Sequence, residues 1–188
     1  MGLDLGQSQD YTALCVAERV DVPTGKARYH LRHLERFRLG TSYPAVVEWV
    51  GAMLAGPPLW GCSQLVVDGT GVGAPVVDMF RQKGLVPIAI TITGGDTVTG
   101  YGGNYRVPKR HLVSTMQVLL QAGLLKVAEE LPDATVLVQE LLNFRVKIDP
   151  LTAHDSYGAW REGQHDDLVL ATAVACWYGE RQPGYGVW

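Results

Sequence analysis

The sequence predicts a single α/β domain built on a mixed sheet, with antiparallel strands first, parallel βα units after them, and helices on both faces. Two observations support this prediction. Residues 1–39 contain segments rich in β-branched and aromatic residues, separated by turn residues, which is typical of an antiparallel meander. From Tyr43 onward, apolar residues at helical spacing alternate with short apolar runs, which is typical of βα units.

The meander is expected to have three strands joined by two turns. Its strands are predicted at Met1–Gly6, Thr12–Arg19 and Ala27–Leu39. The polar segment Gln7–Tyr11 and the stretch 21–26, which contains Pro23 and Gly25, have the composition of turns. Consecutive strands joined by such turns pair antiparallel.

The remainder of the chain predicts alternating helices and strands. Helices are expected at Tyr43–Leu54, Ala74–Lys83, Lys109–Ala122, Pro132–Leu142 and about 166–179. Strands are expected at Gln64–Asp68, Leu85–Thr93, Leu124–Val127 and Phe144–Ile148. Proline at a helix start suits Pro132, although the β-branched residues that follow it would also suit a strand. The domain is expected to span residues 1–180, with a glycine-rich loop or hairpin insertion at about 93–108 and a loose tail at 181–188.

Composition limits the function classes. A hydrophobic content of 47% with 19% charged residues excludes a disordered chain, and no apolar run reaches the about 20 residues of a membrane span. The scattered Cys15, Cys62 and Cys176 are expected to be reduced and buried, as in a cytosolic protein. A net charge of −3 argues against a protein that holds nucleic acid by charge alone.

Acidic residues stand where a metal-dependent enzyme would need them. Asp4 and Asp68 each end an apolar run, and Asp166 and Asp167 open an apolar helix. If the two strands are neighbours and the helix docks beside them, the carboxylates converge and repel one another. Hard divalent cations with oxygen ligands relieve such repulsion. Adjacent helical residues point about 100° apart, so one of Asp166 and Asp167 is expected to be the direct ligand, and the local pattern does not decide which.

Each acidic position also has a purely structural explanation. Asp4 could cap the turn that follows it, and acids in a first helical turn suit the helix dipole. Asp10 fits a turn residue, and His165 fits a solvated loop residue. Supporting roles beside a metal are open for both. The glycine-rich turn 69–73 either cradles a phosphate or only joins a strand to a helix.

Basic and aromatic residues end the glycine-rich segment. Arg106, Lys109 and Arg110 lie near Tyr101 and Tyr105 in the sequence. Interleaving of this kind suits a nucleic-acid backbone and its bases. A solvated loop and helix start explains the pattern equally well.

Four motifs in order resemble the nuclease domain of bacteriophage large terminase subunits, which has a ribonuclease-H-like fold. The motifs are Leu3–Gly6 with Asp10–Leu14, Val67–Gly73, Val107–Val113 and His165–Ala171. Large terminases also carry an ATPase motor, and this chain has no Gly-x-x-x-x-Gly-Lys-Ser/Thr loop. The motor domain is therefore expected to be absent from this chain. Some relatives have a further acid at the position of Leu170.

The resemblance implies a metal-dependent endonuclease that cuts double-stranded DNA with low sequence specificity during viral genome packaging, by two-metal phosphodiester hydrolysis. It implies that Asp4, Asp68 and one of Asp166 and Asp167 hold two Mg²⁺ or Mn²⁺ ions, supported by Asp10 and His165. Arg106, Lys109 and Arg110 would contact DNA. The implied partners are the ATPase motor domain of the same full-length protein and the portal and small terminase subunits. The implied location is the host cytoplasm, and the isolated domain is expected to be a monomer.

Three other functions are considered. A Holliday-junction resolvase of the same fold would form a dimer and prefer four-way junctions. An actin-like or sugar-kinase-like nucleotide-binding half would use Asp4-x-Gly6 and Asp68–Gly71 as phosphate loops, and would need a second domain that 188 residues cannot supply. A non-catalytic DNA-binding module would show no cleavage with Mn²⁺.

Overall fold

The structure, a computed structural model, describes residues 1–6, 10–23, 25–148, 155–159 and 165–182. Residues 7–9 of the first expected turn and residues 183–188 of the expected tail lie outside the described residues. Among the helices of the described part, none is long and apolar enough to cross a membrane.

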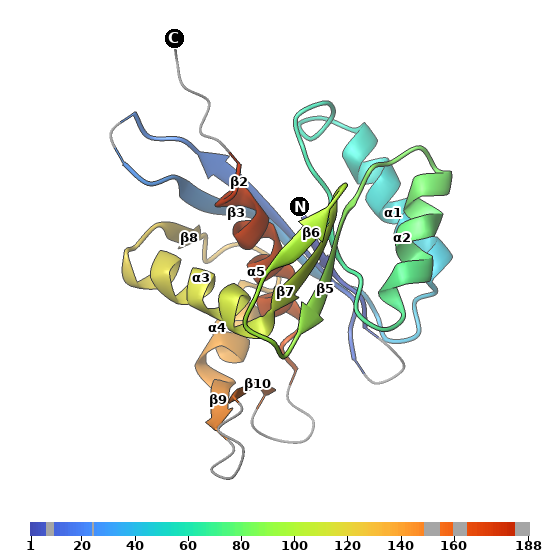
Figure 1. The fold of residues 1–188 in the computed structure, drawn as a ribbon. Coiled ribbons are helices and arrows are strands. Elements are labelled where there is room, and N and C mark those ends of the chain that lie inside the picture. Colours follow the sequence, from blue (N-terminus) through green and yellow to red (C-terminus); the bar gives the residue numbers. More distant parts are fainter. Residues whose placement is uncertain (7–9, 24, 149–154, 160–164, 183–188) are drawn as a thin grey trace.

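Eight strands form one mixed sheet, in the order β6-β7-β5-β4-β1-β2-β3-β8 (Figure 1). Its strands are β1 (Gly2–Asp4), β2 (Ala13–Val20), β3 (Arg28–Arg36), β4 (Val66–Asp68), β5 (Ile88–Thr93), β6 (Thr99–Tyr101), β7 (Asn104–Pro108) and β8 (Leu125–Val127). The first three pair antiparallel. On one side β4, β5 and β7 continue the sheet in parallel, and on the other β8 pairs parallel to β3. The predicted mixed sheet is confirmed.

Helices cover both faces of the sheet, as the sequence predicts (Figure 1). One face carries α1 (Tyr43–Ala55) and α2 (Gly73–Gln82), and the other carries α3 (Lys109–Gln121), α4 (Ala134–Asn143) and α5 (Asp167–Gly179). Successive strand residues point to opposite faces. In β2, Leu14 therefore packs under α1 and α2, while its neighbours Ala13 and Cys15 pack under α5.

The helix α5 is buried along almost its whole length, from Asp167 to Trp177. It lies over β1 and β2 so closely that a Cβ at Gly2 would stand 1.9 Å from the Ala171 carbonyl oxygen. This close approach requires glycine in β1. It also places the N-terminal end of α5 beside the carboxyl ends of β1 and β4.

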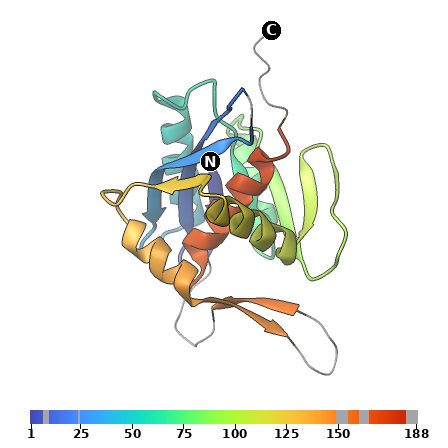
Figure 2. The same ribbon diagram turned by 90° about the vertical axis from the view of Figure 1, so that its left-hand side faces the viewer.

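Of the two forms expected for the glycine-rich stretch, a loop or a hairpin, the structure has the β6–β7 hairpin, whose second strand pairs parallel with β5. The expected strand β9 (Phe144–Ile148) pairs not with the main sheet but with β10 (Asp155–Ala159), a strand that was not expected. Figure 2 shows this second hairpin projecting away from the body of the molecule. Cys15 and Cys176 are buried and free as expected, but Cys62 is exposed.

Candidate active site

Asp4 and Asp68 lie side by side at the ends of two neighbouring strands. β1 and β4 pair in parallel, with Leu3 opposite Val67. Asp4 and Asp68 follow these two residues directly, so they lie at the same end of the two strands. Both carboxyl groups are buried. Burial, with the charges of Asp68, Asp167 and Asp166, raises the pKa of Asp4 well above its usual value. Burial also raises the pKa of Asp68, while hydrogen bonds from Thr70 and Asp4 oppose that shift.

The glycine-rich turn after β4 holds Asp68 in place. The backbone N–H of Thr70 donates to Asp68 Oδ1 at 2.8 Å, and the N–H of Gly69 donates to the Ile90 carbonyl at 2.7 Å. Gly73 packs so tightly that a Cβ there would stand 2.3 Å from the Asp68 carbonyl oxygen. Because these amides are already bonded within the protein, the turn is explained as a strand-to-helix connection that fixes Asp68.

The start of α5 brings two more acids to the same edge, in different surroundings. Asp166 occupies the N-cap position and Asp167 the first helical position. The Asp166 carboxylate pairs with Lys109 Nζ at 3.2 Å. Asp167 is 4% exposed, and burial raises its pKa to about 6 against the opposing effects of His165 and Arg36.

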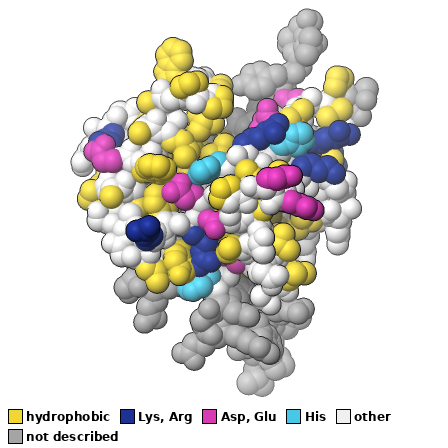
Figure 3. Space-filling view, turned by 180° about the vertical axis from the view of Figure 1, so that it is seen from behind, with side chains coloured by type: hydrophobic (Ala, Val, Ile, Leu, Met, Phe, Trp, Pro, Cys, Tyr) yellow, Lys and Arg dark blue, Asp and Glu magenta, His cyan; other side chains and the backbone are white. Residues whose placement is uncertain are grey.

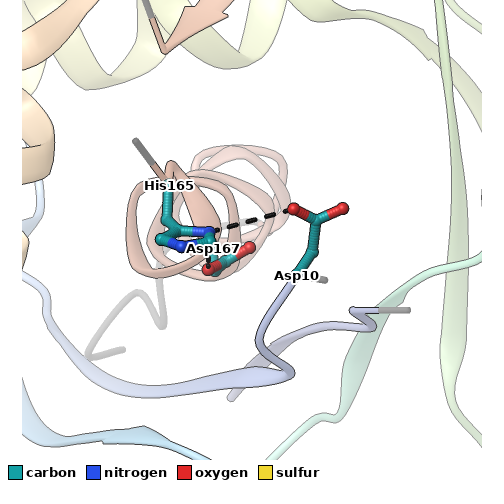
Figure 4. A group of neighbouring side chains, drawn as sticks. All are labelled: Asp10, His165 and Asp167. Atoms are coloured by element: carbon teal, nitrogen blue, oxygen red, sulfur yellow. Dashed lines mark ion pairs between the residues drawn. The ribbon is translucent and has the colours of Figure 1, made fainter. Parts of the chain in front are cut away.

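Asp10, His165 and Asp167 form a compact group of possible metal ligands (Figure 4). One ligand atom from each lies within 4.8 Å of the others. His165 Nδ1 is 3.8 Å from Asp10 Oδ1 and 3.7 Å from Asp167 Oδ2. The Tyr11 ring contacts His165 edge-on, at 5.0 Å between ring centroids. The structure therefore places both residues expected to support the site next to Asp167.

Two charged residues that sequence reasoning missed lie close to Asp167: the partly buried Arg36 and the buried Glu140. Arg36 of β3 stacks over the Tyr11 ring at 3.8 Å, and its Nη2 is 3.6 Å from Asp167 Oδ2. Its Nη1 is 3.8 Å from Oε1 of the buried Glu140 of α4. A signal was available for Glu140, because it continues the buried face of α4 that Ala134 and Leu137 begin. A charge on a buried helix face needs a partner.

The three expected DNA-contact residues do not lie together. Lys109 lies beside the acid cluster, the group formed by Asp4, Asp68, Asp166 and Asp167, and its charge opposes the burial that raises the pKa values of Asp4 and Asp68. Arg110 pairs instead with Asp96 at 2.5 Å, and Arg106 is exposed on β7. No ion pair joins Arg106 or Arg110 to the acid cluster within the described part of the chain.

The cluster has the chemistry of a divalent-cation site. Aspartates outnumber the two cationic side chains, Lys109 and Arg36, that pair with members of the cluster. Asp167 Oδ2 and His165 Nδ1 are buried and have no hydrogen-bond partner among the described residues. Carboxylate oxygens are the preferred ligands of Mg²⁺ and Mn²⁺, and imidazole nitrogen suits transition metals. These residues therefore fit a bound divalent cation.

Comparisons with known proteins show the family and the fold of this chain. A protein-family model described as "Terminase RNaseH-like domain" matches residues 1–177. The fold is similar to that of a solved human cytomegalovirus terminase nuclease domain soaked with Mn, with a TM-score of 0.52 and 15% sequence identity. That match covers 94% of this chain and 80% of the other. The sequence matches no curated protein.

Proposed function

This chain belongs to the terminase RNaseH-like domain family, and we propose that it cuts double-stranded DNA with low sequence specificity, using divalent cations. Membership of the family, which the sequence motifs predicted, carries the role of a nuclease in viral genome packaging. The observation that supports metal dependence is the convergence of Asp4, Asp68 and Asp167, buried together with raised pKa values. Buried carboxyl groups that repel one another favour a bound cation over ionisation alone.

We assign the cation ligands by their surroundings. Asp4 lies between Asp68 on one side and the start of α5 on the other, so it is the residue proposed to contact both of two ions. Asp68 would hold one ion. Asp167 is preferred to Asp166 for the other, because its Oδ2 has no hydrogen-bond partner among the described residues while Asp166 pairs with Lys109. Two bound Mg²⁺ or Mn²⁺ ions would supply an activated water and stabilise the leaving 3′ oxygen.

The neighbouring residues have supporting roles in this proposal. Thr70 fixes the orientation of Asp68 through its N–H. Asp10 and His165 stand beside Asp167, where they can help to orient it. The Lys109 ammonium lies at the cluster and offers positive charge to a DNA phosphate, and Arg106 and Arg110 are proposed backbone contacts farther along β7 and α3.

The charged side chains on one face of the described structure are of mixed sign. On the face seen in Figure 3, Lys and Arg side chains lie among Asp, Glu and His side chains, in keeping with the net charge of −3. Because phosphate contacts supply most non-specific affinity, we expect weak DNA binding by this domain alone. We propose that additional DNA affinity comes from the ATPase motor domain of the full-length protein and from the portal and small terminase subunits. The proposed location is the host cytoplasm. Residues 1–180 are proposed to act as one monomeric nuclease domain.

Plasmid cleavage in Mn²⁺, in Mg²⁺ and in EDTA tests the proposal. Wild type is expected to cut with either ion and not in EDTA. Asp4→Asn is expected to lose at least about 100-fold in rate, because even indirect partners of metal sites cost about 10–100-fold. Asp78→Asn is the matched control, since Asp78 is an exposed acid on α2 that pairs with Arg81. Cutting in EDTA, or an Asp4→Asn variant as active as wild type, would show that the proposed mechanism is wrong.

A further inference from the structure

The partly buried Arg36 and the buried Glu140 form a charge pair next to Asp167. Arg36 Nη1 is 3.8 Å from Glu140 Oε1, and the two side chains are 17% and 5% exposed. Buried charges are retained where each has a partner, and removing one partner leaves the other uncompensated. The pair connects β3 to α4, two elements that lie far apart in the sequence.

Glu140 also holds the helix that carries Asp167. Its Oε2 accepts the backbone N–H groups of Leu168 at 2.9 Å and Val169 at 3.1 Å. These groups belong to the first turn of α5, where backbone donors have no partner within the helix. The N-cap residue Asp166 makes no side-chain capping bond. Glu140 therefore takes the place of a capping residue and ties the start of α5 to α4.

Arg36 reaches Asp167 without forming a hydrogen bond to it. Arg36 Nη2 is 3.6 Å from Asp167 Oδ2, whereas hydrogen-bonded charge pairs usually lie at about 2.7–2.9 Å. His165 Nδ1 lies 3.7 Å from the same oxygen. None of these three atoms has a hydrogen-bond partner among the described residues. Asp167 Oδ2 is thus attracted to Arg36 but remains open to a cation.

We propose that Glu140 is a positioning residue that keeps Arg36 from closing on Asp167, and that it thereby sets the affinity of the site for its divalent cation. This inference rests on the proposed function, because it takes Asp167 as a cation ligand. Without the Glu140 charge, Asp167 is the remaining acidic side chain in the ion pairs of Arg36. Arg36 would then move toward Asp167, and the cation would have to displace a guanidinium that in wild type lies 3.6 Å from that oxygen without a hydrogen bond to it.

Mn²⁺ binding, measured by electron paramagnetic resonance of the free ion at pH 8, tests this inference without cleavage. Glu140→Gln keeps an oxygen that can accept both N–H groups of α5 but removes the charge. We expect it to raise the Kd for Mn²⁺ about tenfold, within the range of coupling between contacting charged groups. Arg36→Met removes the competitor and is expected to bind Mn²⁺ at least as tightly as wild type. The double variant Arg36→Met/Glu140→Gln is expected to return to within about twofold of wild type.

Restoration by the second substitution separates this role from mere support of the fold, since a weakened helix cap would stay weak in the double variant. Glu130→Gln, an exposed glutamate, is the matched control. A Glu140→Gln variant with the wild-type Kd would overturn the inference, as would a double variant as weak as Glu140→Gln. Should Glu140→Gln not unfold cooperatively, weaker Mn²⁺ binding by Arg36→Met alone would overturn it. A wild-type protein that binds no Mn²⁺ would instead contradict the proposed function itself.

Discussion

Asp166 and Asp167 are adjacent in the chain but differ in what surrounds their carboxyl groups. Asp166 points to Lys109, whose ammonium neutralises it at 3.2 Å. Asp167 is enclosed by His165 and Arg36, which approach it to 3.7 and 3.6 Å without forming a hydrogen bond. These adjacent residues thus differ: Asp166 is partly exposed and has a cationic partner, whereas Asp167 is buried and its Oδ2 has no hydrogen-bond partner among the described residues.

This difference predicts unequal effects of isosteric substitutions at the two positions. Asp167→Asn is expected to lower the rate of DNA cleavage at least about 100-fold, because it removes the carboxylate proposed as a direct ligand. Asp166→Asn is expected to cost less than about tenfold, since it removes only the partner of Lys109. Single-turnover cleavage in saturating Mn²⁺ measures both variants. The opposite order of effects would move the ligand assignment to Asp166.

The sequence indicated Asp4 and Asp68 as candidate ligands because an acid at the end of an apolar strand is visible in one segment at a time. Arg36 and Glu140 could not be paired in the same way. Their contacts join β3, α4 and α5, and nothing in the local pattern of any one segment indicates the other two. The buried position of Glu140 could have been suspected from helical spacing, but its partner could not.

At the scale of elements, local patterns placed most helices and strands correctly because each buries one face. α2 and α3 show this directly, with buried Val76, Val77 and Phe80 in one and Leu112, Val113 and Met116 in the other. β10 escaped prediction because its sequence, Asp155–Ala159, lacks the alternation of apolar and polar residues that marks a half-buried strand. Strands that pair outside the main sheet leave a weaker sequence signal.

The contact between β1 and α5 predicts a sharp contrast between two glycine substitutions. Gly2→Ala would place its Cβ 1.9 Å from the Ala171 carbonyl oxygen, so α5 would have to move, at a cost of about 1–3 kcal/mol in the free energy of unfolding. Gly51→Ala lies within α1 with no atom within 4 Å of its Cβ, and is expected to stabilise by about 0.5–1 kcal/mol. Urea unfolding measures the free energy of unfolding of both variants. Equal values would show that a Cβ at position 2 does not displace α5.

At the scale of the whole molecule, the fold brings together acids from three elements: β1, the neighbouring strand β4, and the start of α5. Burial of apolar side chains explains the packing of each element, since β1 and β4 lie between two apolar layers and α5 is buried almost throughout. Their ends nevertheless meet at one edge of the sheet, as the carboxyl ends of parallel strands do. The protein therefore concentrates negative charge at one place in an interior that disfavours it.

That concentration predicts how stability depends on pH and on metal. Burial raises the pKa of Asp4 well above its usual value, that of Asp167 to about 6 and that of Glu140 to about 7. The folded chain therefore binds more protons than the unfolded chain between about pH 4 and pH 7, and the free energy of unfolding falls as pH rises through this window. In EDTA, the Tm is expected to drop by about 5–10 °C from pH 5 to pH 8.

Mn²⁺ should reverse most of that drop, because a cation that binds the ionised carboxylates of the folded state stabilises it by mass action. Differential scanning fluorimetry across pH 5–8, with EDTA or with Mn²⁺, measures both effects. Asp4→Asn removes one of these carboxyl groups, so its Tm in EDTA should vary less with pH and should gain less from Mn²⁺. A wild-type Tm that is flat from pH 5 to pH 8 in EDTA, or that falls equally with Mn²⁺ present, would mean that the buried acids are not held as a metal site.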